Sequence, residues 1–162
     1  MAPPDPLPDD EAAFLSQAID QALAAEQQGN LPIGAVIVLH GQVISRGANA
    51  IWRPNLELTR HAEMEALRAV PQELWPQAHA MRLYTTLEPC LMCAGAILLH
   101  HLGGVVFGST DPQGGIAFCL ANLPPYFHAA FAMVDWRGPI APDECDPLYR
   151  RVVEHERRRR AT

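Results

Sequence analysis

The sequence predicts an α/β protein in which helices cover both faces of one sheet. Short runs of β-branched and other apolar residues, long enough for strands, alternate along the chain with longer segments of helical period. This alternation is typical of α/β folds, whose sheets are buried on both faces. The 162 residues contain no internal repeat and no boundary strong enough to divide them, so a single domain is expected.

The chain opens with a proline-rich stretch and its first helix. Residues 1–8 hold four prolines and are expected to form a flexible lead-in to one domain spanning 9–162. The sequence predicts a helix at about residues 8–29, because acidic residues lie at its start and Gly29 and Asn30 at its end. Its apolar stripe consists of Phe14, Leu15, Ala18, Ile19, Ala22 and Leu23.

The rest of the chain divides into alternating strands and helices. Residues 34–47 form two β-branched runs turned at 40–41, which predicts a hairpin. Residues 48–59 lack a clear period and carry a proline, which favours a loop, and a helix is expected from about 61 to 70. After a proline-rich linker, the remaining predicted elements are a strand at 81–86, a helix at 90–102, strands at 104–109 and 131–136, and a helix at roughly 143–158.

The composition is that of an ordinary globular protein. It is 49% hydrophobic and 19% charged, and no apolar run approaches the roughly 20 residues that a membrane span needs. The first residues have no basic or apolar signal region, so nothing suggests export and a cytoplasmic location is expected. The four cysteines do not resemble a disulfide framework, and in a reducing cytosol the close pair favours metal binding or catalysis.

Charge is distributed unevenly. The net charge of −6 argues against a dedicated nucleic-acid binder. The chain has no lysine, however, and six of its twelve arginines are Arg150, Arg151 and residues 157–160. Such a basic stretch on an acidic body can contact phosphates, or it can be a solvated helix end whose arginines complement the helix dipole. Both interpretations remain open at this point.

Cys90 and Cys93 lie three residues apart, directly after a proline and at the start of a predicted helix. This spacing puts both thiols on one face, where the positive end of the helix dipole favours the thiolate. A redox dithiol and a metal site would use the same arrangement. The pair alone does not decide between them.

His61 and Glu63 favour the metal interpretation. His61 also opens a predicted helix, and an imidazole beside two thiolates suits zinc. Three protein ligands leave a tetrahedral zinc one open position for water, which is the catalytic arrangement, and a nearby carboxylate can take the proton of that water. A lone histidine or glutamate at a helix start is usually a capping residue. His-x-Glu followed by Pro-Cys-x-x-Cys is, in combination, the signature of zinc-dependent nucleobase deaminases.

Several blocks of the chain resemble the cytidine-deaminase-like superfamily and, within it, the tRNA adenosine deaminases. These blocks are "LPIGAVIV", "RHAEMEALR", "LYTTLEPCLMCAGAI", "GGVVFGSTDPQGG" and "PDECDPLYRRVVEHERRRR", and they cover most of the chain in the family's order. The resemblance implies a three-layer α/β/α sandwich with a mixed five-stranded sheet. It also implies a homodimer in which neighbouring subunits help to shape each site.

The resemblance also assigns roles to individual residues. His61, Cys90 and Cys93 match the ligands of one Zn²⁺ per subunit, and Glu63 matches the catalytic proton shuttle. Asn49 matches an asparagine that hydrogen-bonds the substrate base or ribose, and the backbone around Ala62 is expected to contact the ring.

The chain departs from the family in regions that recognise substrate. The loop before His61 is one residue longer than in typical bacterial tRNA deaminases and carries Trp52 and Arg53. Arg60 stands where bacterial members usually have alanine, and Gln113 replaces an expected basic residue. The segment "LPPYFHAAFAMVDW" is also unlike the usual sequence. The chemistry is therefore better specified than the substrate.

The sequence leads to one main functional hypothesis and several alternatives. The main hypothesis is a zinc hydrolase that deaminates adenosine to inosine at the wobble position of the tRNA anticodon loop, where bases are already unstacked. The first alternative is a deaminase of a free base or nucleoside, such as guanine or cytosine. A Cys-x-x-Cys thiol oxidoreductase and a structural zinc module are the others, although the first of these leaves His61 and Glu63 without a role.

Overall fold

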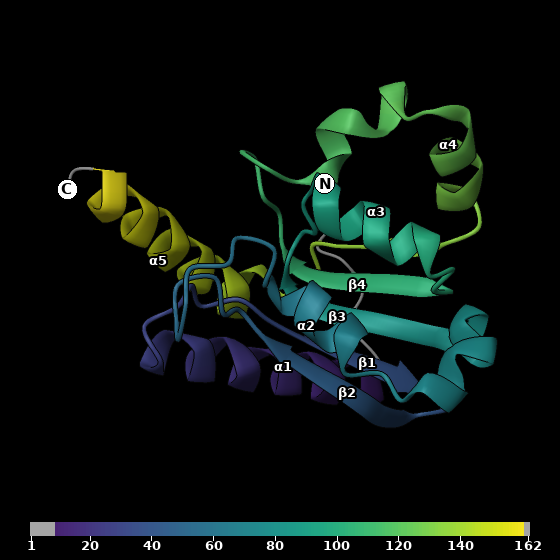
Figure 1. Cartoon of the computed structure of the whole chain (residues 1–162), viewed down its shortest axis with the longest axis horizontal. Helices are drawn as coiled ribbons and strands as arrows, with labels where there is room; N and C mark the ends of the chain where they lie inside the picture. The colour runs from purple at the N-terminus through teal and green to yellow at the C-terminus, as the bar shows by residue number, and fades with distance from the viewer. Residues whose placement is uncertain (1–8, 161–162) are drawn as a thin grey trace.

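A five-stranded sheet forms the centre of the computed structural model, which describes residues 9–160 (Figure 1). The strand order is β2-β1-β3-β4-β5. Strand β1 runs antiparallel to β2 and β3, whereas β4 runs parallel to β3 and β5, so the sheet is mixed as expected. The strands are β1 Gly34–Leu39, β2 Gln42–Ala48, β3 Met81–Leu87, β4 Gly104–Ser109 and β5 Asp135–Arg137. The proposed flexible lead-in, residues 1–8, lies outside the described part of the chain.

Helices cover both faces of this sheet. They are α1 Asp9–Gln27, α2 Ala62–Arg68, η1 Gln72–Ala80, α3 Leu91–Leu99, η2 Ile116–Asn122, α4 Pro125–Phe131 and α5 Pro142–Arg160. Val36 of β1 packs toward Phe14 of α1, whereas its neighbour Ile37 packs in the cluster that holds Ala66 of α2. Side chains alternate between the faces of a strand, so α1 and α2 lie on opposite sides, and the three-layer prediction is confirmed (Figure 1).

Two glycines allow the helices to approach the sheet closely. A Cβ atom on Gly47 of β2 would lie 2.0 Å from the carbonyl oxygen of Ala62 and 2.4 Å from the amide nitrogen of Ala66. A Cβ atom on Gly34 of β1 would lie 2.1 Å from the carbonyl oxygen of Ala18 in α1. Since both contacts are to backbone, only glycine permits these distances. Gly47 thereby determines how close the start of α2 lies to β2.

The first predicted hairpin is confirmed, because β1 and β2 pair across a turn in which His40 and Gly41 both have positive φ. Two other predictions were wrong in part. The expected strand at 131–136 is mostly helix and turn, and only Asp135–Arg137 pairs with β4. Proline at the first helical position favours the start of α4 at Pro125, and that helix continues to Phe131. The expected linker after α2 contains the 3₁₀ helix η1. Among the described residues, no helix is long and apolar enough to cross a membrane.

Candidate metal centre and active site

The potential metal ligands lie at the starts of two helices on the same side of the sheet. His61 is the N-cap residue of α2, and Cys90 is the N-cap residue of α3, with Cys93 one turn further on. N-cap side chains commonly accept a hydrogen bond from their own helix, but neither of these does so. Both side chains are therefore available to a ligand.

The three side chains converge on one point. The Nδ1 atom of His61 lies 3.6 Å from Sγ of Cys90 and 3.5 Å from Sγ of Cys93. All three donor atoms lie within 4.8 Å of one another. A nitrogen and a sulfur bound to one tetrahedral zinc at ordinary bond lengths lie about 3.6 Å apart. The spacing and the donor set, one imidazole and two thiols, therefore fit zinc.

The protonation of the cluster also suits a metal. The neighbouring Cys93 thiol, with a smaller contribution from His61, lowers the pKa of Cys90 to about 4. The same contact with Cys90, together with burial, raises the pKa of Cys93. A thiol that loses its proton readily supplies the thiolate that zinc requires.

Glu63 points at the same cluster from the first turn of α2. It is 3% exposed, and its Oε2 atom accepts a hydrogen bond of 3.5 Å from Sγ of Cys93. Burial raises the pKa of Glu63 to about 7, although the charge of His61 opposes this shift. A carboxyl group of this kind beside a metal centre can both accept and release a proton near neutral pH.

A cavity of about 320 Å³ opens onto the cluster and collects most of the predicted site residues. It is lined by Leu31, Ile33, Asn49, Ile51, Leu58, His61, Glu63, Leu87, Glu88, Cys90, Asp111, Val152 and Glu156. Asn49 is 1% exposed, and its amide nitrogen has no hydrogen-bond partner among the described residues. Its Oδ1 atom accepts a hydrogen bond of 3.4 Å from the Ile51 amide. Ala62 is fully buried against β2 and does not line the cavity.

Three acidic residues that line this cavity, Glu88, Asp111 and Glu156, were not found by the sequence analysis. Glu88 is 5% exposed, and its carboxylate accepts hydrogen bonds from the backbone amides of Asp111 at 3.1 Å and Ala117 at 2.9 Å. A Cβ atom on Gly115 would lie 2.4 Å from this carboxyl group, so the loop closes tightly around it. Glu88 therefore holds the loop that places Asp111 at the cavity. Its position next to Pro89 and Cys90 was the one available signal in the sequence.

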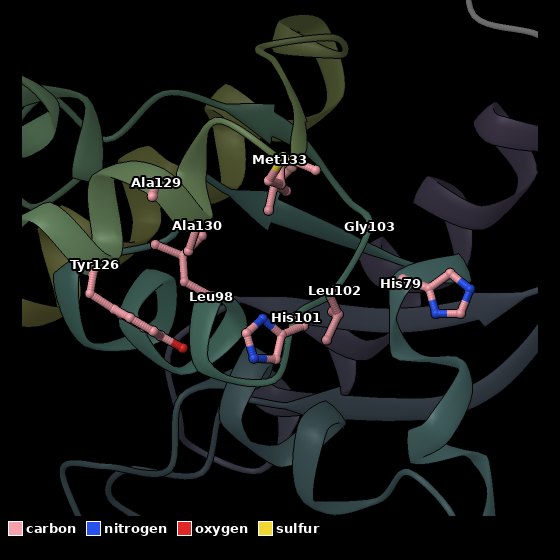
Figure 2. Close-up of a pocket in the computed structure, with 10 residues that line it drawn as sticks. His79, Leu98, His101, Leu102, Gly103, Tyr126, Ala129, Ala130 and Met133 are labelled. Carbon is pink, nitrogen blue, oxygen red and sulfur yellow. The ribbon is translucent and has the colours of Figure 1, made fainter.

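A second cavity lies away from the potential metal ligands. It has a volume of about 530 Å³ and is lined mostly by apolar side chains from the end of α3, from α4 and from the residues that follow each helix (Figure 2). Figure 2 shows Leu98, Tyr126 and Met133 around it, with His101 and His79 at its edge. None of the potential metal ligands lines it. The candidate catalytic cavity is therefore the smaller one beside His61.

Comparison with known proteins agrees with this geometry. The family model described as the cytidine and deoxycytidylate deaminase zinc-binding region matches residues 8–109. This chain belongs to that family. It is a zinc-dependent deaminase, and its cofactor is one zinc ion.

The relatives of this deaminase include enzymes named for tRNA. A tRNA-specific adenosine deaminase of Bacillus subtilis is 42% identical over 114 residues, which are 68% of each chain. A tRNA(Ile)-lysidine synthase of Deinococcus radiodurans is 34% identical over 98% of this chain, which corresponds to 26% of that protein. A solved structure of a tRNA:A34 deaminase, studied for A-to-I editing at the wobble position, is 30% identical with a TM-score of 0.69 and covers 85% of this chain and 99% of its own.

Proposed function

We propose that this deaminase converts adenosine to inosine at the wobble position of tRNA. The observation that carries the proposal is the convergence of His61, Cys90, Cys93 and Glu63 at the cavity, in a chain 42% identical to a tRNA-specific adenosine deaminase. A cytoplasmic location is part of this proposal. The catalytic unit is proposed to be the single domain 9–162.

His61, Cys90 and Cys93 are the proposed zinc ligands, through Nδ1 and the two Sγ atoms. Their mutual distances of 3.5 to 3.6 Å and the low pKa of Cys90 support this assignment. When bound, zinc lowers the pKa of water and so supplies a nucleophile at neutral pH. The helix starts at Ala62 and Leu91 keep the three ligands on a rigid frame.

Glu63 is the proposed proton shuttle. Its carboxylate takes a proton from the attacking water and delivers it to a ring nitrogen of the base. It then takes the remaining proton of the oxygen now bound to C6 and passes it to the amino group, which leaves as ammonia as its bond to C6 breaks. The products are inosine and ammonia, and the water supplies the oxygen that replaces nitrogen at C6. The buried position of Glu63 beside Cys93 supports this role.

Asn49 and the backbone at Ala62 are proposed to position the base. Asn49 lines the cavity, and its amide nitrogen is buried without a hydrogen-bond partner among the described residues. A buried donor of this kind costs free energy unless a ligand satisfies it. Ala62 follows His61 directly at the start of α2, so its backbone, rather than its side chain, is the part that can contact a ring.

We propose further that the enzyme is a homodimer that associates through the surface around the second cavity. Large apolar side chains are exposed on α3, on η2 and α4, which contact it, and on the residues after α4, and two of them, Tyr126 and Met133, line the cavity. The most exposed of them are Leu91, Leu99, Phe118, Tyr126 and Met133. Large exposed apolar side chains on neighbouring elements are typical of protein interfaces. Replacing Leu91 and Leu99 by glutamate should yield a monomer in analytical ultracentrifugation, and an unchanged dimer would place the interface elsewhere.

The substrate is tested by mass spectrometry with zinc-loaded protein. One reaction contains an anticodon stem-loop RNA with adenosine at the wobble position, and the other contains pooled free bases and nucleosides. We expect inosine in the stem-loop and no change in the pool. Deamination in the pool alone would identify a small-molecule deaminase instead.

A further inference from the structure

A basic cleft lies next to the catalytic cavity, further along the same helix α5. It has a volume of about 350 Å³ and is lined by Gly29, Trp52, Arg53, His155, Arg158 and Arg159. These residues come from the turn after α1, from the loop between β2 and α2, and from the last turns of α5. In a chain of net charge −6 without lysine, the cleft gathers three of the twelve arginines.

The cleft and the catalytic cavity share the same two segments. Within the loop, Ile51 lines the catalytic cavity, whereas Trp52 and Arg53 line the cleft. Along α5, Glu156 lines the catalytic cavity, and Arg159, one turn later, lines the cleft. A strand with one base in the catalytic cavity therefore has the cleft as its immediate neighbour.

The wall of the cleft is held in place by a buried side chain. Asn30 is fully buried, and its Oδ1 atom accepts hydrogen bonds from the backbone amides of Trp52 at 2.9 Å and Arg53 at 3.0 Å. The ring of Trp52 packs against α5, with the guanidinium of Arg159 4.1 Å from its centroid. A solvated helix end would need no such contacts with a distant loop. The loop and the helix form one assembled surface.

The chemistry of this surface suits single-stranded RNA. Guanidinium groups bind phosphate oxygens through paired hydrogen bonds. Arg159 lies over one side of the half-buried Trp52 ring, and a base can stack on the part of an indole ring that stays exposed. The acidic neighbour of Arg158 is Glu154, whose carboxylate lies 3.8 Å away with both side chains largely exposed. Such a pair contributes little, so a phosphate can replace it.

We propose that the basic cleft binds the sugar-phosphate backbone of the RNA strand beside the reacting adenosine, with Arg53 and Arg158 on phosphates and Trp52 stacked on a neighbouring base. This inference rests on the proposed action on tRNA and extends it to a site outside the catalytic cavity. The extended loop that carries Trp52 and Arg53 then acquires a role in substrate binding.

The test measures the affinity of zinc-loaded protein for a fluorescent anticodon stem-loop RNA at salt concentrations from about 50 to 200 mM, a range over which the loss of phosphate contacts changes the affinity measurably. Each phosphate contact to a single strand contributes about 0.7 to the slope of log affinity against log salt concentration. The variant Arg53→Gln/Arg158→Gln should therefore lower that slope by about 1.4, and Trp52→Leu should lower the affinity about tenfold or more.

Arg46→Gln is the matched control. Arg46 is exposed on β2, contacts Gln17 of α1 and lies outside both cavities, so its replacement removes a charge without touching the cleft. Zinc content and melting temperature verify that each variant is folded. An unchanged slope and affinity in the cleft variants, or an equal loss in Arg46→Gln, would overturn the proposal.

The outcome for the cleft is separable from that for the proposed function. If the RNA binds through the cleft but contains no inosine after incubation, the proposed reaction is wrong and the cleft stands. If the RNA is deaminated and the cleft variants bind it as tightly as the wild type, the cleft is wrong and the reaction stands.

Discussion

Replacing Gly47 by alanine should separate the proposed zinc ligands by moving the helix that carries one of them. The added Cβ atom would lie 2.0 Å from the Ala62 carbonyl oxygen, whereas ordinary contacts begin at 3.4 Å. The start of α2 must therefore move by up to 1.4 Å, the difference between these two distances. His61 and Glu63 move with α2, while Cys90 and Cys93 remain on α3.

The expected effects concern both stability and metal binding. Overpacking of a well-packed contact costs about 1–3 kcal/mol in the free energy of unfolding. Metal–ligand distances tolerate changes of about 0.2 Å, so a shift of this size should weaken zinc binding by about 10- to 100-fold. Urea denaturation measures the first quantity, and competition with a chromophoric chelator measures the second.

Gly34→Ala is the matched control for this prediction. Its added Cβ atom would lie 2.1 Å from the Ala18 carbonyl oxygen, so the overpacking is similar, but the helix that it displaces is α1, which carries none of the proposed zinc ligands. We expect both variants to lose stability and Gly47→Ala alone to lose zinc affinity. If Gly47→Ala bound zinc as tightly as Gly34→Ala, the argument that β2 positions His61 would be refuted.

Two further predictions concern residues of the catalytic cavity. Glu88→Gln should lower the free energy of unfolding by about 1–3 kcal/mol, because the backbone amide of Asp111 or of Ala117 would then face an amide donor in place of a carboxylate oxygen. Urea denaturation measures this change, and an unchanged midpoint would contradict this role of Glu88. Asn49→Ala should retain zinc and lower kcat/KM for the stem-loop RNA about tenfold or more, because it removes a buried donor proposed to bind the base. Steady-state kinetics and zinc analysis of the variant test this prediction. If Asn49→Ala had the kcat/KM of the wild type, Asn49 would have no role in binding the base.

The local parts of the fold and site were predictable from sequence. The hairpin follows from two β-branched runs and a turn at His40 and Gly41 that adopts positive φ. The metal cluster was predictable because both halves of it lie at helix starts, where residue type and spacing are informative. The segment that begins at Phe131 was predicted to be a strand because its short apolar run is compatible with either a strand or a helix. In the structure Phe131 ends α4, and only the three residues Asp135–Arg137 form a strand.

Contacts between segments distant in the chain could not be predicted from the sequence. Trp52 contacts Arg159, which lies more than a hundred residues later in the chain. No local sequence pattern predicts that the loop and the last helix line the same cleft. Glu88 presented a similar difficulty, because its two backbone partners lie on a loop more than twenty residues away. Such contacts depend on how the helices pack on the sheet, and periodicity and composition do not specify that packing.

The central claim is that one cluster holds zinc and that Glu63 beside it moves the protons. Zinc content and ammonia release should be measured together, on the stem-loop RNA, for the wild type and Glu63→Gln. We expect about the same zinc content in both proteins and a loss of turnover of about 10²- to 10⁴-fold in the variant, the range for removal of a general acid–base. Full activity in Glu63→Gln would contradict the account.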